Sequence, residues 1–269
     1  MYPAPVIIQP VSALLVALAT PIHPTLLPFG FIPVLHAFRI SIVYRSLSRK
    51  AGGNSSVAAN LVGFLLMAWG GSIVSHILLS LPIPQLLSFT PLLVYATTHF
   101  CLPDIRNLPS LKTLDSIFPL VDALLRTTAI AAGVEACRNH PSPAISGSLS
   151  IQLFIGAVAS SAGGISAQTL SVWEPSWRLN RPIFLQEGTM LAGTDVWSGT
   201  LSSSIPKIDR STYSADSLNS PLLSSTDAKA TAASILTLIY CWRVYNVHHL
   251  PKIGGKTNKA AQDSKSKEE

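Results

Sequence analysis

Long apolar stretches dominate this chain and most constrain how it can fold. Crossing the hydrocarbon core of a bilayer as a helix takes about 20 predominantly apolar residues. Six windows meet this requirement, at residues 29–46, 57–80, 86–103, 115–137, 146–170 and 228–248. A weaker seventh window, residues 183–204, contains two acidic residues and would not be identified by hydropathy alone. The pattern predicts an all-α, polytopic membrane protein.

The composition supports this interpretation. Only 12% of the 269 residues are charged, whereas soluble domains have about 25%. That is too little charge to cover a water-facing surface of this size. The three cysteines, Cys101, Cys137 and Cys241, lie at long, irregular intervals, so a disulfide framework is not indicated. We expect all three to be small apolar core residues.

Several classes of function are disfavoured. The net charge is +6, but no basic cluster with aromatic or glycine-rich context precedes the C-terminal tail, so we expect no nucleic-acid partner. No GxSxG, HExxH, P-loop or paired-carboxylate pattern is present, and the histidines have no metal-binding spacing. We therefore expect neither an enzyme nor a metal site.

The basic residues indicate how the chain crosses the membrane. Thirteen of the nineteen Lys and Arg residues lie in alternate gaps between the windows, at the window edges beside those gaps, or at the C-terminal end. Cytoplasmic loops of membrane proteins are enriched in Lys and Arg, so the N-terminus is predicted to be lumenal and the C-terminus cytosolic. This orientation requires an odd number of spans, which favours seven and includes the weak window. Asn54 begins a glycosylation sequon on the predicted cytosolic side, so it should stay unmodified.

The last residues contain a candidate address signal, for which the alternative is a chance pattern in a Lys-rich tail. Lys265 and Lys267 stand fifth and third from the end, the dilysine pattern by which coat proteins return membrane proteins to the endoplasmic reticulum. Such a signal is read by a receptor and does not anchor the chain. A cytosolic tail is where it would be read, so we expect a protein of the endoplasmic reticulum membrane.

Two glycine pairs mark a candidate ion pathway. Each pair lies near the middle of a window and is followed by small polar residues, and glycine pairs weaken helices and are recognised kink sites. Matching glycine-interrupted segments in two inverted halves point to a substrate or ion pathway. The predicted pathway residues are Gly70, Gly71, Ser72, Ser75, Gly163, Gly164, Ser166 and Gln168.

Helix packing is the alternative explanation for the same glycines. Gly156, Ser160 and Gly164 are four residues apart and make a smooth strip against which another helix could lie closely. For either pair alone packing is favoured, whereas the repetition of the pairs favours a pathway.

Few ionisable residues lie inside the windows. They are costly in a bilayer and usually face the bundle interior or a wet cavity. Asp122 and Arg126 are four residues apart, so they can form a structural ion pair on one helix. Alternatively, Arg126 meets a lipid phosphate or lines the pore, and Asp122 attracts cations. His76 is expected to be a packing residue. Arg39 and Glu135 also lie inside the windows.

The ordered series of segments resembles the trimeric intracellular cation (TRIC) channels, in a divergent, fungal form. The segments are FIPVLHAFRISIVY, WGGSIVSHILLSLP, FCLPD, IFPLVDALLRTTAIAAGVEACR and GAVASSAGGISAQTL followed by WEPSW. The similarity covers residues 28–180 and resumes weakly in the last window.

The resemblance implies seven transmembrane helices, with two inverted three-helix repeats plus a final helix, and a homotrimer with one pore in each protomer. It also implies that Arg126 matches an arginine that binds a phosphoinositide headgroup. The family's lysine one turn away is replaced by Asp122, and a lysine of the fifth helix aligns with Ala159. These replacements put lipid binding and lysine-dependent gating in doubt.

These observations give one organisation and one function. The predicted regions are residues 1–28 (N-terminal lumenal segment), 29–204 (six-helix inverted-repeat pore region), 205–227 (lumenal loop), 228–250 (seventh helix) and 251–269 (cytosolic tail). We expect a potassium channel that supplies counter-ion current for calcium release and uptake, with potassium ions and membrane lipids as partners and a phosphoinositide as the one candidate cofactor. The alternatives are a non-conducting, lipid-binding scaffold and a slow secondary transporter.

Overall fold

The regular structure of the chain is helical. The structure is a computed structural model, and it describes residues 8–23, 25, 27, 29–53, 56–102, 111–181 and 224–248. The helices are α1 (Gln9–Ala19), α2 (Phe31–Lys50), α3 (Val57–Leu78), the 3₁₀ helix η1 (Pro84–Leu86), α4 (Thr90–Cys101), α5 (Leu111–Ile117), α6 (Pro119–Arg138), α7 (Pro143–Ser146), α8 (Leu149–Leu170) and α10 (Ser225–His248). The described residues contain no strand, only one β-bridge between His23 and Leu27. The predicted all-α class is confirmed.

Helices α3 and α8 are built alike. Each has 22 residues and begins at a serine, Ser56 or Ser148, whose side chain accepts a hydrogen bond from the backbone three residues on. Such a cap satisfies one of the N–H groups that the first turn leaves without a partner. Among the described residues, these two helices are the ones long and apolar enough to cross a membrane by length and composition.

Prolines explain where the helices depart from the apolar windows. The window 115–137 is divided, because α5 ends at Ile117 and Pro119 begins α6. Proline lacks a backbone N–H and disfavours helix in the residue before it, so a helix ends more readily than it continues there. The residues before α4 form η1 instead of a longer helix for the same reason, since Pro84 is the first residue of η1 and Pro91 the second of α4.

Helix α1 was not expected from the apolar windows. It has 11 residues, too few for a spanning window, and lies in the segment 1–28 that was expected to be an N-terminal lumenal segment. Its buried residue Leu15 packs with Leu124 of α6 and Ala230 of α10. Helix α1 is therefore part of the packed structure.

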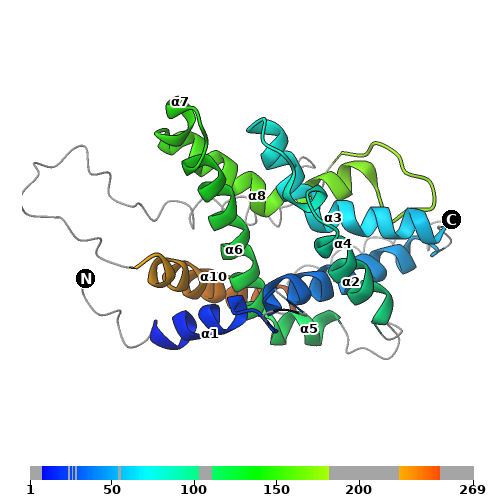
Figure 1. Ribbon diagram of the computed structural model, residues 1–269. Helices are drawn as coiled ribbons and strands as arrows, with labels where there is room; N and C mark the ends of the chain where they lie inside the picture. The colour runs from blue at the N-terminus through cyan, green and yellow to red at the C-terminus, as the bar shows by residue number, and fades with distance from the viewer. Residues whose placement is uncertain are drawn as a thin grey trace, which may run out of the picture.

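The helices pack around the α3–α8 pair (Figure 1). Helix α3 lies along α8, α8 along α6, α10 along α6 and α1, and α2 along α4. The largest buried cluster gathers aromatic residues of α2, α3 and α4, among them Tyr44, Phe64 and Tyr95, together with Ala167 of α8. Elements of both predicted halves therefore share one core.

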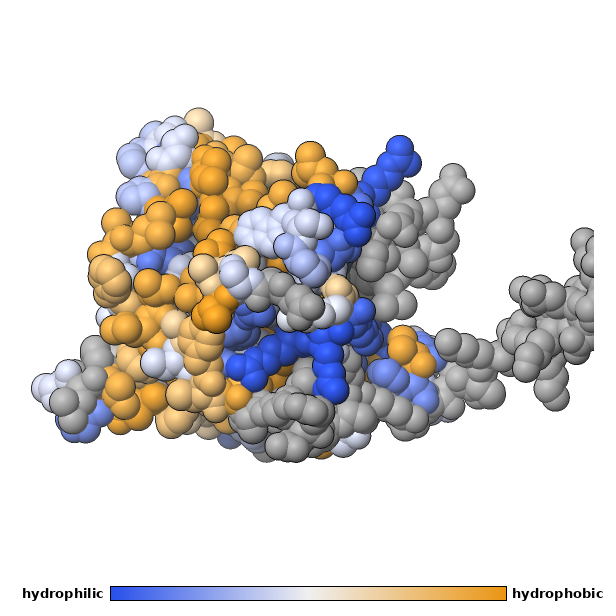
Figure 2. Space-filling view, turned by 90° about the vertical axis from the view of Figure 1, so that its right-hand side faces the viewer, coloured by the Kyte–Doolittle hydropathy of each residue, from blue (hydrophilic) through white to orange (hydrophobic). Residues whose placement is uncertain are grey.

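The surface is that of a chain that faces lipid. Large apolar side chains stand exposed on several helices, including Phe89, Leu238 and Trp242. Soluble monomers seldom expose so much apolar surface. Figure 2 shows a broad hydrophobic area beside a band of hydrophilic residues on the face at the right of Figure 1. The exposed Arg49 and Lys50 end α2.

The cysteines correct one expectation. Cys137 is fully buried as expected, whereas Cys101 and Cys241 are exposed. Both lie on helices with other exposed apolar residues, so they occupy the outer, lipid-facing surface and not the core.

Candidate ion pathway

Three of the four predicted glycines form the crossing of α3 and α8. A Cβ atom added to Gly71 would lie 2.1 Å from the carbonyl oxygen of Ala159, and one added to Gly163 would lie 2.6 Å from that of Met67. At Gly70 the nearest atom would be the Cα of Gly163, at 2.9 Å. The two backbones are in direct contact, so these glycines serve close helix packing.

Gly164 differs from the other three glycines. A Cβ atom at this position would meet no atom within 4 Å, although Gly163 beside it is buried in the crossing. Both helices continue without a break through their glycine pairs. The packing explanation thus holds for Gly70, Gly71 and Gly163, and Gly164 faces open space on α8.

The polar residues that follow Gly71 have different surroundings. Ser75 is buried and its hydroxyl donates to the carbonyl oxygen of Gly71 in its own helix, at 2.7 Å. Ser72 is half-buried, and its hydroxyl donates to the Oε1 of Gln85 at 3.2 Å. His76 reaches back to the carbonyl oxygen of Ser72, at 2.8 Å, as expected of a packing residue. Ser72 therefore offers a more accessible oxygen than Ser75 does.

The polar residues of α8 lie beyond its glycine pair. Ser166 and Gln168 are both half-buried, and they lie two and four residues after Gly164 on α8. Gln85, which bonds Ser72, was missed by sequence reasoning because it stands in η1, outside the two glycine segments. The only feature of the sequence that could have identified Gln85 is that it is a polar residue among prolines and leucines.

Ala159 sits at the centre of a three-helix contact. Its carbonyl faces Gly71 of α3, and its methyl group would lie 2.7 Å from a Cβ atom on Gly133 of α6. This is the position at which the resemblance leads one to expect a lysine. The close approach of α3 and α6 on either side explains why a small residue occupies it here.

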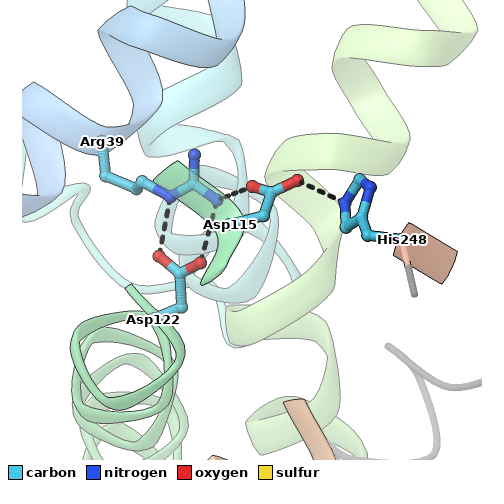
Figure 3. A network of polar contacts seen from close by, with 4 residues as sticks. All are labelled: Arg39, Asp115, Asp122 and His248. Carbon is cyan, nitrogen blue, oxygen red and sulfur yellow. Dashed lines mark hydrogen bonds and ion pairs between the residues drawn. The ribbon is translucent and has the colours of Figure 1, made fainter. Parts of the chain in front are cut away.

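Arg39 is the centre of a polar network with residues from four helices, α2, α5, α6 and α10 (Figure 3). Its Nε and Nη2 donate to the two carboxylate oxygens of Asp122, at 2.8 and 2.9 Å. Nη2 also donates to Asp115 Oδ1 of α5, at 2.8 Å. A bidentate guanidinium–carboxylate pair is among the strongest charge-assisted contacts. The other oxygen of Asp115 lies 3.5 Å from Nε2 of His248.

The network corrects the local pairing expected for Asp122. Spacing of four residues allowed a pair with Arg126, but the carboxylate of Asp122 is held by Arg39 of α2. Arg126 instead donates from Nη1 to the carbonyl oxygen of Ser160 in α8, at 3.0 Å. Asp122 is therefore neutralised from another helix, and it joins the two halves of the chain.

The starts of α2 and α6 resemble each other in sequence. Residues 31–38 read FIPVLHAF and residues 117–124 read IFPLVDAL, which aligns His36 with Asp122 and Arg39 with Leu125. Arg39 of the first segment binds Asp122 of the second. The contact therefore joins two similar segments from the two predicted halves of the chain.

Two further histidines contact polar groups of neighbouring helices. His36 Nδ1 lies 2.8 Å from the hydroxyl of Tyr95. His99 contacts the Ser41 hydroxyl through Nδ1, at 2.6 Å, and the Asn60 Oδ1 through Nε2, at 2.9 Å. These polar groups are satisfied by their neighbours, so they fix α2, α3 and α4 relative to one another.

Several predicted features lie outside the described residues. They are the weak window 183–204, nearly all of the loop 205–227, Asn54, and the tail with Lys265 and Lys267. Among the residues the structure describes, no group of three or more His, Cys, Asp or Glu side chains could hold a metal ion.

Comparison with known proteins gives matches at the level of structure. No family model and no curated protein matches the sequence. A trimeric intracellular cation channel from C. elegans with bound Ca²⁺ matches with a TM-score of 0.61 and 12% identity, over 90% of this chain and 98% of that one. The structure of such a channel from C. elegans in the absence of Ca²⁺ matches with a TM-score of 0.55 and 15% identity, over 90% of this chain and 99% of that one.

A third structure, of TRIC counter-ion channels in calcium release, gives a TM-score of 0.60 and 16% identity, over 88% of this chain and 99% of that one. The match covers nearly the whole of each channel, so the likeness is one of complete folds. The chain therefore has the multi-pass helical membrane fold of the TRIC channels.

Proposed function

We propose that this chain, which has the fold of the TRIC channels, forms a homotrimeric channel that conducts monovalent cations, chiefly potassium, through a pathway in each protomer. We place it in the endoplasmic reticulum membrane with a lumenal N-terminus and a cytosolic C-terminus, where its current would balance the charge carried by calcium. The coverage of whole channel structures supports this function.

The observation that carries the proposal is the α3–α8 crossing. Two helices from the two halves meet backbone to backbone, and the residues that follow the crossing are polar on both helices. Gly164 leaves open space beside this crossing. Neutral oxygens of Ser72, Gln85, Ser166 and Gln168 would replace part of the hydration shell of a passing cation, so conduction would be passive and selectivity would not need a charged ring.

Arg126 is the residue through which we expect the protein to bind a membrane lipid. We keep Arg126 as the lipid or gating contact and a phosphoinositide headgroup as its candidate ligand. Two features weigh on this assignment: Arg126 already donates to Ser160, and the neighbouring Asp122 is committed to Arg39.

A non-conducting scaffold is the second candidate, because a specific observation favours it. The small residues Gly71, Ala159 and Gly133 bring α3, α8 and α6 into close contact, which leaves no room between these helices at that level. A protein that kept the fold and lost the pore would show such packing.

The direct test is planar-bilayer recording of the purified full chain, with Gly164→Leu as the decisive variant. A leucine at this open position should narrow the pathway without disturbing the crossing, so we expect potassium current to fall at least about tenfold while the trimer stays intact. Phe154→Leu, an exposed position on the same helix, is the matched control and should leave the current unchanged.

Other outcomes distinguish the candidates. Silent bilayers with intact trimers would favour the scaffold. A saturable flux orders of magnitude slower than channel current would favour a secondary transporter. Full potassium current in the Gly164→Leu variant would show that α8 does not line the pathway at this position.

A further inference from the structure

Residues 171–181, which we call the α8 extension, fold back over the end of α8. The backbone N–H of Arg178 donates to the carbonyl oxygen of Leu170, at 3.3 Å. The backbone N–H of Asn180 donates to that of Thr169, at 2.8 Å. These two carbonyls are among the four that the end of a helix leaves without a partner inside the helix. The α8 extension is therefore fixed to the last turn of α8.

The α8 extension has an anchored first part and an exposed second part. Val172 is only 1% exposed, and its carbonyl oxygen accepts from the hydroxyl of Tyr44 in α2, at 3.2 Å. Trp173 packs against the same buried cluster. Further on, Trp177 is 39% exposed and Leu179 is 81% exposed. An aromatic and an aliphatic side chain are thus held at the surface by a segment that is rooted in the core.

The length of α8 places this exposed part at the surface of the membrane. Helix α8 has 22 residues, which at about 1.5 Å per residue extend about 33 Å. The hydrocarbon core of a bilayer is about 30 Å thick. A segment that folds over the end of such a helix lies at the level of the lipid headgroups. Tryptophan is enriched at this level, because its ring is apolar and its N–H is polar.

Basic side chains stand beside Trp177. The side chain of Arg178 is 68% exposed, and Arg181 is exposed as well. Nε and Nη2 of Arg178 both lie 2.7 Å from Oε2 of Glu174, which fixes the position of the guanidinium on the surface. A guanidinium group matches the geometry of a phosphate and can bind it through two parallel hydrogen bonds.

The end of α2 brings two more cations to the same end of the molecule. Arg49 and Lys50 are exposed and are the last residues of α2. Helix α3 starts nearby, since a Cβ atom on its Gly63 would lie 2.7 Å from the carbonyl oxygen of Val172. The ends of α2 and α8 and the start of α3 lie together at the right of Figure 1. The band of hydrophilic residues in Figure 2 is on this side.

We propose that the α8 extension binds an anionic glycerophospholipid. Trp177 and Leu179 enter the headgroup layer, Arg178 and Arg181 bind the lipid phosphate, and the basic end of α2 adds attraction for a headgroup of net negative charge. The orientation proposed above puts this site in the cytosolic leaflet, where anionic lipids are concentrated. The site is separate from the phosphoinositide contact of Arg126, which bonds the middle of α8. It depends on the membrane-spanning fold and not on conduction.

The test identifies the lipid beside Trp177 in the full chain, reconstituted into nanodiscs of phosphatidylcholine and phosphatidylserine in a four-to-one ratio. In two matched preparations, bromine atoms that quench tryptophan fluorescence are carried either by the phosphatidylserine or by an equal amount of phosphatidylcholine. The chain has five tryptophans, so the signal of Trp177 is taken as the fluorescence lost in Trp177→Phe. A basic residue near an anionic surface strengthens the attraction about fivefold, so brominated phosphatidylserine should quench Trp177 at least about twofold more strongly.

Charge variants show which groups select the lipid. The preference for phosphatidylserine should fall in Arg181→Gln and disappear in the double variant Arg178→Gln/Arg181→Gln. Lys229→Gln is the matched control, because it removes one exposed charge near the start of α10, on the other side of the molecule in Figure 1. Glu174→Gln removes the acid beside Arg178 and should increase the preference, a change that loosening of the α8 extension would not produce.

Three outcomes would overturn the proposal. They are equal quenching of Trp177 by the two lipids, a wild-type preference in the double variant, and no quenching of Trp177 by either lipid, which would place the α8 extension outside the bilayer. Potassium current, measured on the same preparations after transfer to planar bilayers, separates this proposal from the channel. Current without a lipid preference would overturn the lipid site alone, and a lipid preference without current would overturn the channel alone.

Discussion

Adjacent glycines in α8 do different things. Gly163 lies in backbone contact with α3, and Gly164 has open space where a side chain would begin. The glycines of the crossing also differ in how closely the other helix approaches them. A Cβ atom added to Gly71 would lie closer to its nearest neighbour than one added to Gly70 or Gly163. A glycine pair in a sequence therefore indicates a close approach without saying which member makes it.

Alanine substitutions separate these roles. Gly71→Ala should destabilise the fold by about 2–3 kcal/mol, because its methyl group overlaps a backbone oxygen that cannot move independently. Gly164→Ala should be neutral or stabilising by up to about 1 kcal/mol, since alanine favours helix where space allows. Thermal unfolding in one detergent measures both. Equal losses at the two positions would contradict the geometry described for the crossing.

Among the helices, α2 and α6 are joined by a bidentate ion pair. Arg39 and Asp122 are 83 residues apart in sequence, and their bidentate ion pair joins the two halves of the chain. Both groups are partly withdrawn from water, so removing one leaves the other without its partner.

Charge reversal tests this link. Arg39→Asp or Asp122→Arg alone should lower stability by about 2–3 kcal/mol, because each brings like charges together. The combined exchange should recover part of that loss, although Asp115 would then face a carboxylate. Thermal unfolding of the four proteins at neutral pH gives the coupling. Ser160→Ala is a suitable control, since its backbone carbonyl, not its side chain, meets Arg126.

The sequence predicted the long helices well and their interruptions poorly. Apolar windows placed α3, α8 and α10 within a few residues, because apolar length alone defines such helices. Helix α1 was missed because 11 residues cannot span a bilayer, and the break before Pro119 was missed because hydropathy does not register a proline.

The candidate site shows the same limit. Residue type identified the glycines, but only the packing of the folded chain distinguishes Gly71 from Gly164. Local spacing suggested Arg126 for Asp122, whereas the partner lies in another half of the protein. Long-range pairs of this kind leave no signature in the spacing of a single sequence.

At the scale of the whole molecule, the first and last described helices are fastened together. Ser12 of α1 donates to Asp227 Oδ1 of α10 at 2.7 Å, across 215 residues of sequence. Ser224 caps the start of α10 by accepting from the Asp227 backbone N–H, and its hydroxyl donates to Asp227 Oδ2. The hydrogen bonds from Ser224 and then Ser12 hold the pKa of Asp227 below its usual value.

The stabilising effect of the hydrogen bonds to the Asp227 carboxylate should decrease in acid. A lowered pKa means that the carboxylate is favoured in the folded state, so its stabilising effect is present at neutral pH and is lost as the pH falls below about 4. Ser12→Ala and Asp227→Asn should therefore lower the melting temperature at pH 7 and reduce its fall toward pH 3.5. Glu135→Gln, an exposed carboxylate that bonds Asn139, is the control. A wild-type fall toward pH 3.5 in both variants would exclude Asp227 as its cause.

The ion pair between α2 and α6 also limits how the chain can change over evolution. An acid at position 122 is tolerable because an arginine stands at position 39. The pair draws one member from each predicted half, so these two positions cannot diverge independently. Among homologues, residues 39 and 122 are expected to vary together: where position 122 is basic, arginine at position 39 should be absent.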